Sequence, residues 1–161
     1  MIDSERTAVY AAEQAAFDGT DLESVRPVEA VVAAIDAVTS GAWWPGPSVR
    51  VTSTRRDARS SSARLVDDSV TEIRLSREQM TVATAAHELA HALAGPAAGH
   101  GAVYRVAYLD VVAVMTNSDP VDRRHHLHVE QLAEAFRDAR LSVGERHWPP
   151  PPESTGIAIA L

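Results

Sequence analysis

The stretch from Thr81 to Ala94 contains a single charged side chain, Glu88, among alanines, leucines and two histidines. An apolar stripe at helical spacing runs through it, formed by Val82, Ala86, Leu89 and Leu93. This pattern predicts a helix, and a helix with so little charge must be buried over most of its surface. Because an unpaired buried charge is costly, Glu88 needs a specific reason for its position. We therefore expect the rest of the chain to fold around this helix.

The same helix carries the motif His87-Glu88-Leu89-Ala90-His91. Two histidines four residues apart on a helix project from one face and can hold a single metal ion, while the glutamate between them reaches a water molecule on that ion. We therefore predict that His87 and His91 are metal ligands and that Glu88 is a general base. The alternatives are histidines packed in a core and a Glu88 that only forms an ion pair.

A third ligand is expected after the helix, because Gly95-Pro96 ends it and the small residues that follow let the chain turn back. His100 is the candidate, and a carboxylate from Asp110, Glu130 or Glu134 is the alternative. With His100, the metal has three neutral ligands and an open position for water. The chain has no cysteine, so thiolate ligands and a cysteine nucleophile are excluded.

Three polar residues after the motif each have two interpretations. Tyr104 or Tyr108 could donate a hydrogen bond to a developing oxyanion, or could belong to the apolar stripe of the next helix. Asp110 could orient a ligand imidazole, or could be an acid on the surface of that helix. We name Tyr104, beside Glu88, as a catalytic candidate.

Apolar periodicity and helix start and stop residues predict helices in most of the remaining chain. We predict helices over 4–18, 27–40, 77–94, from 101 or 102 onward, and over 121–141. Ser4 is the expected cap of the first helix, and Ser76 with Gln79 forms a capping-box signature before the motif helix.

Three short strands are expected before the motif helix, around Val49 and Val51, over 63–66 and over 71–75. The sequence Asp67-Asp68-Ser69 favours a tight turn, so the last two strands should form a hairpin. The segment Trp43-Trp44-Pro45-Gly46-Pro47 favours a turn whose tryptophans cover the edge of the core.

Together these elements predict an α+β fold, in which a small three-stranded sheet packs against the motif helix and further helices at both ends complete the core. A length of 161 residues suits one domain, which we place over 1–144. The proline-rich segment over 145–161 is expected to be an extended or disordered tail, with a docked strand over 157–161 as an alternative.

Charge and hydropathy exclude some classes of function. The net charge of -7 argues against general nucleic-acid binding, because neutralising phosphates requires a basic surface. A local basic patch could contact nucleic acid or an acidic partner, but we favour a solvated loop: Arg50, Arg55, Arg56, Arg59 and Arg64. A group of three histidines could hold a second metal ion, but we favour a solvated helix face: His125, His126 and His128. No segment approaches the about 18 apolar residues of a membrane span, and the first residues lack the apolar core of a signal peptide, so we expect a cytoplasmic protein with no membrane contact.

The motif stretch HELAHALAG…GHGAVYR resembles the HExxH…HGxxF/W pattern of SprT-like zinc metalloproteases. The chain is also similar to a small family of metallohydrolases of actinobacteria and their phages, which opens with an RxxYAAE-like segment, here Arg6 to Glu13, and carries a tryptophan pair, here Trp43-Trp44. The resemblance covers about residues 6 to 140.

The resemblance implies zinc at His87, His91 and His100, catalysis by Glu88, and a minimal zincin-like fold in which a sheet edge presents extended peptide to the metal. The leading hypothesis is therefore a zinc-dependent hydrolase that acts on a peptide or protein substrate. One alternative is a non-catalytic, zinc-stabilised binding module of phage or host origin. The other is a repressor-cleaving metallopeptidase that takes a downstream carboxylate as its third ligand.

Overall fold

The computed structural model describes residues 3–53, 59–117, 119–122, 124 and 126–155. This part of the chain is an α+β fold of five α-helices and one three-stranded sheet, as predicted. The helices are α1 (Arg6–Phe17), α2 (Val28–Thr39), α3 (Val82–Ala94), α4 (Ala102–Thr116) and α5 (Leu127–Asp138). The strands are β1 (Ser48–Ser53), β2 (Ser62–Asp67) and β3 (Val70–Leu75).

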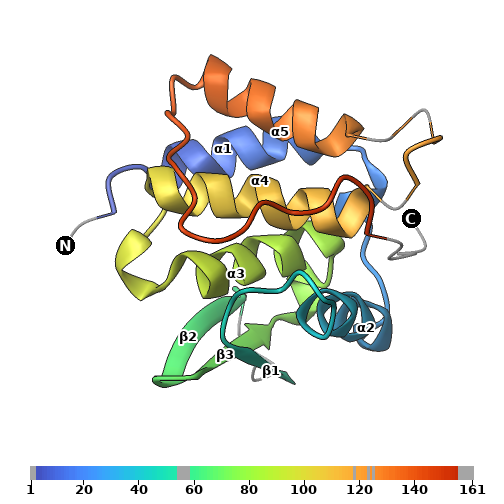
Figure 1. Ribbon diagram of the computed structural model, residues 1–161, viewed down its shortest axis with the longest axis vertical. Helices are drawn as coiled ribbons and strands as arrows, with labels where there is room; N and C mark the ends of the chain where they lie inside the picture. Colours follow the sequence, from blue (N-terminus) through green and yellow to red (C-terminus); the bar gives the residue numbers. More distant parts are fainter. Residues whose placement is uncertain (1–2, 54–58, 118, 123, 125, 156–161) are drawn as a thin grey trace.

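The helix that carries the motif, α3, lies in the middle of the molecule. Figure 1 shows α4 packed along one side of it and the sheet on the other, with α1 and α5 beyond α4 and α2 beside the sheet. Ala85, Leu89 and Ala90 of α3 are fully buried, as the absence of charge along this helix predicts. One continuous apolar cluster joins α3 to the other helices and to β3.

The sheet has the strand order β1-β3-β2, so β2 is an edge strand. The predicted hairpin is confirmed, because β2 pairs with β3 in antiparallel register, whereas β1 runs parallel to β3. Alternation along β3 buries Ile73 and Leu75 against the helices. Trp43 and Trp44 pack at the edge of the core, as expected.

The outer face of the sheet carries an ion cluster around Glu72. Arg50 on β1 and Arg64 on β2 lie opposite this residue, and both guanidinium groups contact its carboxylate, at 3.0 and 2.9 Å. Hydrogen bonds from Arg74, and then from Arg64 and Arg50, hold the pKa of Glu72 at about 2 although burial opposes this shift. Arg50 and Arg64 are therefore strand residues with a common carboxylate partner, and Arg55 and Arg56 lie outside the described residues.

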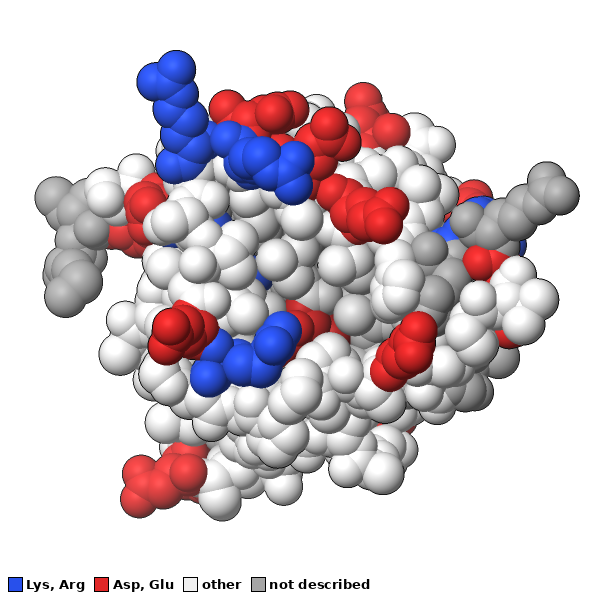
Figure 2. Space-filling view, turned by 45° about the horizontal axis from the view of Figure 1, so that its top comes forward, with Lys and Arg blue, Asp and Glu red and all other residues white. Residues whose placement is uncertain are grey.

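One face of the molecule illustrates the acidic composition. On the face shown in Figure 2, acidic side chains are spread among uncharged ones, and the described basic side chains form no continuous patch. Across the described residues, the helices lack the combination of length and apolar character that crossing a bilayer requires.

Three helix starts differ from the predicted ones. Residues Arg77–Gln79 form a separate 3-10 turn, and α3 begins only at Val82. The capping-box prediction is wrong because Gln79 uses its side-chain oxygen to accept a hydrogen bond from the backbone nitrogen of Ser61, at 2.7 Å. Thr81 caps α3 instead, by accepting a hydrogen bond from the nitrogen of Thr84 at 3.1 Å.

The other two differences are at α1 and α5. No side-chain cap is found at the start of α1, which begins at Arg6 rather than at Ser4. The last helix starts at Leu127, six residues later than predicted, because His126 adopts a left-handed conformation with φ of 67° that a continuous helix does not allow.

The segment after Gly144 is extended, which is one of the two states expected for it, and it packs along α4 (Figure 1). Backbone contacts hold both ends: Gly144 donates to the carbonyl of Ala102 at 2.9 Å, and the hydroxyl of Thr155 donates to the carbonyl of Val114 at 2.9 Å. A Cβ at position 144 would lie 2.9 Å from the backbone of Ala102, so glycine allows this close approach. We call residues 142–155 the C-terminal strap. Residues 157–161, where a strand was an alternative, lie outside the described part.

Asp110 of α4 fastens the middle of the strap. Its carboxylate accepts two hydrogen bonds from Arg146, at 2.8 and 2.9 Å, and one from the indole nitrogen of Trp148 at 2.8 Å. Asp110 is 3% exposed, so it is not the surface acid that the sequence allowed, and its carboxylate faces the strap rather than a ligand imidazole.

We expect Asp110→Asn to lower the free energy of unfolding by about 1–3 kcal/mol, because a charged acceptor of three hydrogen bonds becomes a neutral one. The lower half of this range is favoured because the Arg146 side chain is 40% exposed and water screens its charge. Urea unfolding measures the change, and Asp36→Asn on the exposed side of α2 is the control. Equal stability of the Asp110 variant and the control would contradict a fastened strap.

Candidate metal centre

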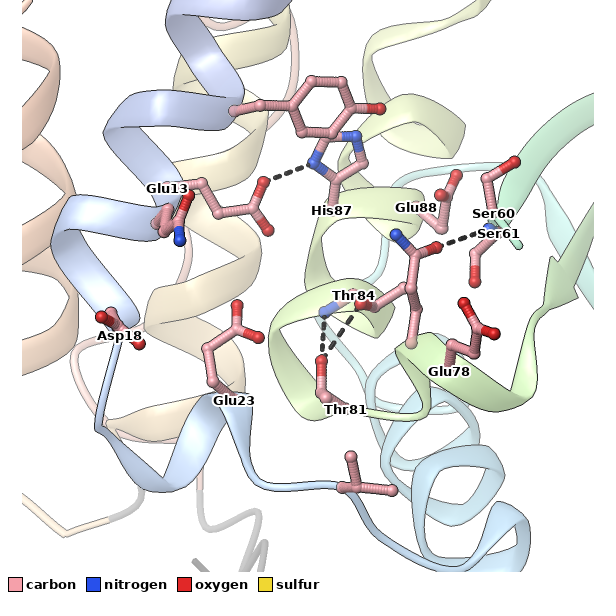
Figure 3. Close-up of a pocket in the computed structure, with 14 residues that line it drawn as sticks. Glu13, Asp18, Glu23, Ser60, Ser61, Glu78, Thr81, Thr84, His87 and Glu88 are labelled. Atoms are coloured by element: carbon pink, nitrogen blue, oxygen red, sulfur yellow. Dashed lines mark hydrogen bonds and ion pairs between the residues drawn. The ribbon is translucent and has the colours of Figure 1, made fainter.

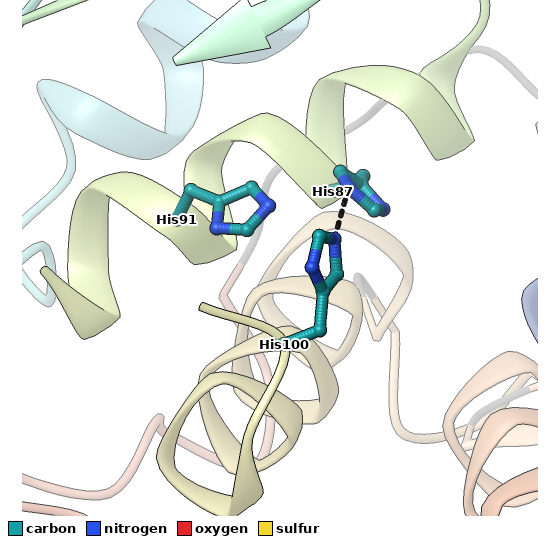
Figure 4. Close-up of side chains that lie close together, drawn as sticks. All are labelled: His87, His91 and His100. Atoms are coloured by element: carbon teal, nitrogen blue, oxygen red, sulfur yellow. Dashed lines mark hydrogen bonds between the residues drawn. The ribbon is translucent and has the colours of Figure 1, made fainter. Parts of the chain in front are cut away.

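Three imidazoles converge in a partly closed site beside α3 (Figure 4). His87, His91 and His100 each offer a ring nitrogen within 4.8 Å of the others, which is close enough for them to hold one metal ion. The Nε2 atoms of His87 and His100 face each other at 3.3 Å. His87 and His100 are buried and His91 is partly buried. The predicted ligand set is thus brought together.

Local backbone conformation explains how His100 returns to α3. The helix ends at Gly95, whose φ of 86° is favourable only for glycine, and Pro96–Ala98 then form a single 3-10 turn. Gly99, with φ of 52°, reverses the chain immediately before His100. These two glycines therefore allow the turn that brings His100 back to α3, as predicted from the sequence.

A buried arginine that the sequence analysis did not single out supports this turn. Arg105 is 1% exposed, and its guanidinium donates to the carbonyl of His100 at 2.8 Å and contacts the carboxylate of Glu5 at 3.1 Å. It also donates to the carbonyl of Ser142 at 2.6 Å. The turn, the N-terminal segment and the C-terminal strap are thus joined at one side chain.

Carboxylates from the N-terminal segment bind the far side of two of the imidazoles. Glu13 of α1 lies 2.9 Å from Nδ1 of His87, and Asp3 bonds both Nδ1 and the backbone nitrogen of His100. When both rings are neutral, each carboxylate accepts an Nδ1 proton and both Nε2 lone pairs point into the space between the rings. Two lone pairs at 3.3 Å repel each other unless a proton or a metal ion lies between them.

The pKa values of the three histidines differ because their surroundings differ. Burial, followed by the charge of His87, lowers the pKa of His91 to about 3, so this ring is neutral at neutral pH. Burial also lowers the pKa of His100, against the opposing hydrogen bond of Asp3. For His87, burial is outweighed by the hydrogen bond and charge of Glu13, and the pKa is raised. His91 and His100 are therefore already in the neutral form that binds metal.

Glu88 lies beside this site with its carboxylate unbonded. The residue is 5% exposed, and no described residue forms a hydrogen bond or ion pair with it. Burial raises its pKa to about 7, with the charge of His87 opposing and that of Glu13 adding to the shift. A buried carboxylate without a partner, next to a metal site, is available to take a proton from water.

Two cavities meet at His87 and Glu88. The larger, of about 710 Å³, is a groove between the edge strand β2 and the end of α3, and all three histidines line it. The smaller, of about 360 Å³, lies on the other side of Glu88 and is shown in Figure 3. His87, Glu88, Tyr10 and Ser61 line both cavities, so the two spaces share a wall.

The two candidate tyrosines lie beneath the imidazoles. Tyr104 is fully buried, with its ring centre 4.4 to 5.4 Å from those of the three histidines, and its hydroxyl donates a long bond of 3.5 Å to the carbonyl of His87. The hydroxyl of Tyr108 donates to Glu13 at 2.7 Å. Tyr108 therefore holds the carboxylate that orients His87.

The other candidate ligands are elsewhere. Asp110 binds the strap, and Glu134 lines a separate cavity between α1 and α5. Among the described residues, neither these two nor Glu130 belongs to the group that can hold a metal ion. His126 bonds Asn117, and His128 is 9% exposed and packs against Phe17, so the solvated face expected there is wrong for His128. His125 lies outside the described residues.

Residues on one face of α1 close the site, and none of them was predicted to be a site residue. Arg6, Tyr10 and Glu13 are three to four residues apart and lie on one helical stripe. The ring of Tyr10 stacks on His87, with ring centres 5.1 Å apart and planes 7° apart, while the guanidinium of Arg6 lies 5.4 Å from its centre. The available signal was the spacing of these polar residues, which places them on one side of the predicted helix.

Comparisons of the chain with protein-family models, characterised proteins and solved structures found no match.

We expect Glu13→Gln to weaken metal binding about 10- to 100-fold, because the imidazole of His87 loses the carboxylate that orients it and increases its basicity. Competition with a chelator for Co²⁺, monitored by the visible spectrum of the bound ion, measures the affinity. Glu134→Gln is the matched control and should bind as the wild type does. If Glu13→Gln also leaves affinity unchanged, the carboxylate has no part in holding the metal.

Proposed function

We propose that this protein is a zinc-dependent hydrolase, most simply a peptidase, with His87, His91 and His100 as ligands. The observation that carries the proposal is the 3.3 Å separation of the two facing Nε2 atoms beside an unpartnered, buried Glu88. Nitrogen ligands about 2.0–2.1 Å from a tetrahedral zinc ion lie about 3.3–3.4 Å apart, so His87 and His100 are spaced as two ligands of this ion. Among the described residues these two Nε2 atoms bond only each other, so a metal ion between them would replace a single shared proton.

Zinc held in this way supplies a Lewis acid that activates water and polarises a carbonyl group. The chain's own residues do the remaining work. Glu88 accepts a proton from the attacking water as the new carbon–oxygen bond forms, and returns a proton to the amine as the carbon–nitrogen bond breaks. Burial favours the neutral form of Glu88, so the carboxylate gains a proton readily in the first of these steps.

A peptide is the favoured substrate class because β2 is an edge strand that borders the metal groove. The strand is exposed along most of its length, and its free edge can pair with an extended chain through backbone hydrogen bonds. A peptide paired in this way would run past the three histidines. This arrangement also supports a minimal zincin-like fold as part of the proposal.

Stabilisation of the oxyanion requires a donor that reaches the groove. Tyr104 remains the candidate predicted from the sequence, but its ring is fully buried and its hydroxyl bonds a backbone carbonyl. Tyr10 is 41% exposed, lines the groove and forms no hydrogen bond to a described residue through its hydroxyl. We therefore assign the donor role to Tyr10.

Glu88→Gln should lower kcat for peptide hydrolysis by about 10²- to 10⁴-fold while metal content stays near one ion per chain, because the amide cannot accept the proton of water. A quenched peptide library screened with the wild-type protein supplies the substrate, and metal analysis of both proteins is the control. A variant as active as the wild type would refute the mechanism and favour a zinc-stabilised binding module.

Replacing Tyr10 by phenylalanine should lower kcat by about 10²-fold with little change in KM, since only the interaction with the developing oxyanion is lost. Tyr104→Phe is the comparison, and we expect it to reduce stability by about 1 kcal/mol with a much smaller loss of kcat. Steady-state kinetics on the same peptide and urea unfolding separate the two effects. The reverse order of kcat losses would return the role to Tyr104.

A further inference from the structure

The smaller cavity has an unusual excess of negative charge. Five carboxylates line it, and none of the described residues that line it is an arginine or lysine: the acids are Glu13, Asp18, Glu23, Glu78 and Glu88. Serine, threonine and glutamine side chains supply most of the other polar lining. Figure 3 shows these groups around the open space between α1, the start of α3 and the segment that leads into β2.

Two of these acids are adjacent to the metal centre, and three are not. Glu13 binds His87, and Glu88 lies beside the same residue, so their charges offset the charge of a bound metal ion. Asp18 follows α1, while Glu23 and Glu78 come from two short 3-10 turns, Asp21–Glu23 and Arg77–Gln79. These three acids therefore carry negative charge that a metal ion bound to the histidines would not balance.

The acids of the cavity influence one another. Burial raises the pKa of Glu23, and the charges of Glu13 and Asp18 raise it further. Such mutual repulsion costs free energy in the absence of a cation. A cavity that keeps this arrangement is electrostatically prepared to bind positive charge.

The position of Glu88 at the wall shared with the metal groove also indicates a ligand here. Glu88 is 5% exposed, makes no hydrogen bond or ion pair with a described residue, and lines the cavity beside Ser60 and Ser61 (Figure 3). A buried carboxylate in this state normally has a partner that the protein alone does not supply. Since Glu88 lines both cavities, that partner lies where the two spaces join.

An organic cation fits this cavity better than a second metal ion. Among the described residues, no three of the five carboxylates are close enough together to ligate one ion. The volume of about 360 Å³ falls within the range of small-molecule sites, about 300–1,000 Å³. A guanidinium or ammonium group on a flexible stem can reach separated carboxylates, whereas a bare divalent cation requires them around a single point.

We propose that this acidic cavity is a specificity subsite that binds the basic side chain, arginine or lysine, of a peptide residue adjacent to the bond cleaved at the metal. The inference rests on the proposed function, because the shared wall of His87 and Glu88 places a substrate's neighbouring side chain there. Asp18, Glu23 and Glu78 bind the positive head group, and Ser61 and Gln79 supply polar contacts at the rim.

Binding of a small probe tests the subsite without relying on hydrolysis. Nα-acetyl-arginine amide is titrated into the zinc-loaded full chain by NMR, and Nα-acetyl-citrulline amide is the uncharged comparison. The arginine probe should shift signals of cavity residues and bind at least tenfold more tightly than citrulline, less so at high salt. Equal binding of the two probes would overturn the proposal, as would displacement of the arginine probe by millimolar Ca²⁺ or Mg²⁺ at constant ionic strength.

Substitutions of the cavity acids test whether the arginine probe binds in this cavity. The double change Asp18→Asn with Glu23→Gln should weaken the arginine probe at least tenfold, whereas Glu29→Gln, an exposed acid of α2 outside the cavity, should leave it unchanged. Circular dichroism checks that each variant is folded. If the double variant does not fold, the affinity of Glu78→Gln for the arginine probe is measured in its place. Unchanged affinity in the folded cavity variants would place the probe elsewhere and refute the subsite.

Cleavage by the wild-type protein separates the two proposals. A peptide library should be cut next to arginine or lysine at least tenfold faster than next to glutamate or citrulline. Cleavage without that preference overturns the subsite and leaves the hydrolase intact. Arginine binding with no cleavage of any peptide leaves the cation site standing and refutes the peptidase.

Discussion

The hydrogen bond between Glu13 and His87 connects α1 to the buried motif helix, and the candidate site depends on it. It fixes the proton on Nδ1 and so directs the Nε2 lone pair toward His100. Tyr108 holds the same carboxylate from α4, so three helices meet in one buried polar chain. Asp3 repeats the arrangement at His100. A buried network of this kind is favourable only when every member is satisfied, which leaves the facing lone pairs as the position for an ion.

The arrangement divides tasks between parts of the chain that are distant in sequence. The α3 helix and the turn after it supply the imidazoles and Glu88, while the N-terminal segment supplies the carboxylates that orient them and the tyrosine stacked above. The edge strand β2 forms the opposite wall of the groove. Arg105 and the C-terminal strap secure the turn from behind. Loss of order at either end of the chain would therefore affect the candidate metal centre.

Periodicity predicted much of the fold, because apolar spacing and turn chemistry are local signals. The buried α3, the hairpin of β2 and β3, and the return of His100 after Gly95 all follow from residues near one another in the sequence. Helix starts were less accurate because they depend on distant partners: Gln79 was expected to cap a helix but bonds Ser61 instead. Asp110 was ambiguous because its partners, Arg146 and Trp148, are far along the chain.

The sequence by itself determined the three converging histidines, the glutamate among them and the absence of thiolate ligands, since helical spacing and a glycine turn suffice to bring these groups together. Only the tertiary structure decided which carboxylates orient the imidazoles, that Tyr10 lies over His87 while Tyr104 is buried, and that five acids surround one cavity. These features arise where α1, the 3-10 turns and α3 pack together. No local pattern encodes them, because they depend on contacts between distant segments: the bonded carboxylate and imidazole are 74 residues apart in one pair and 97 in the other.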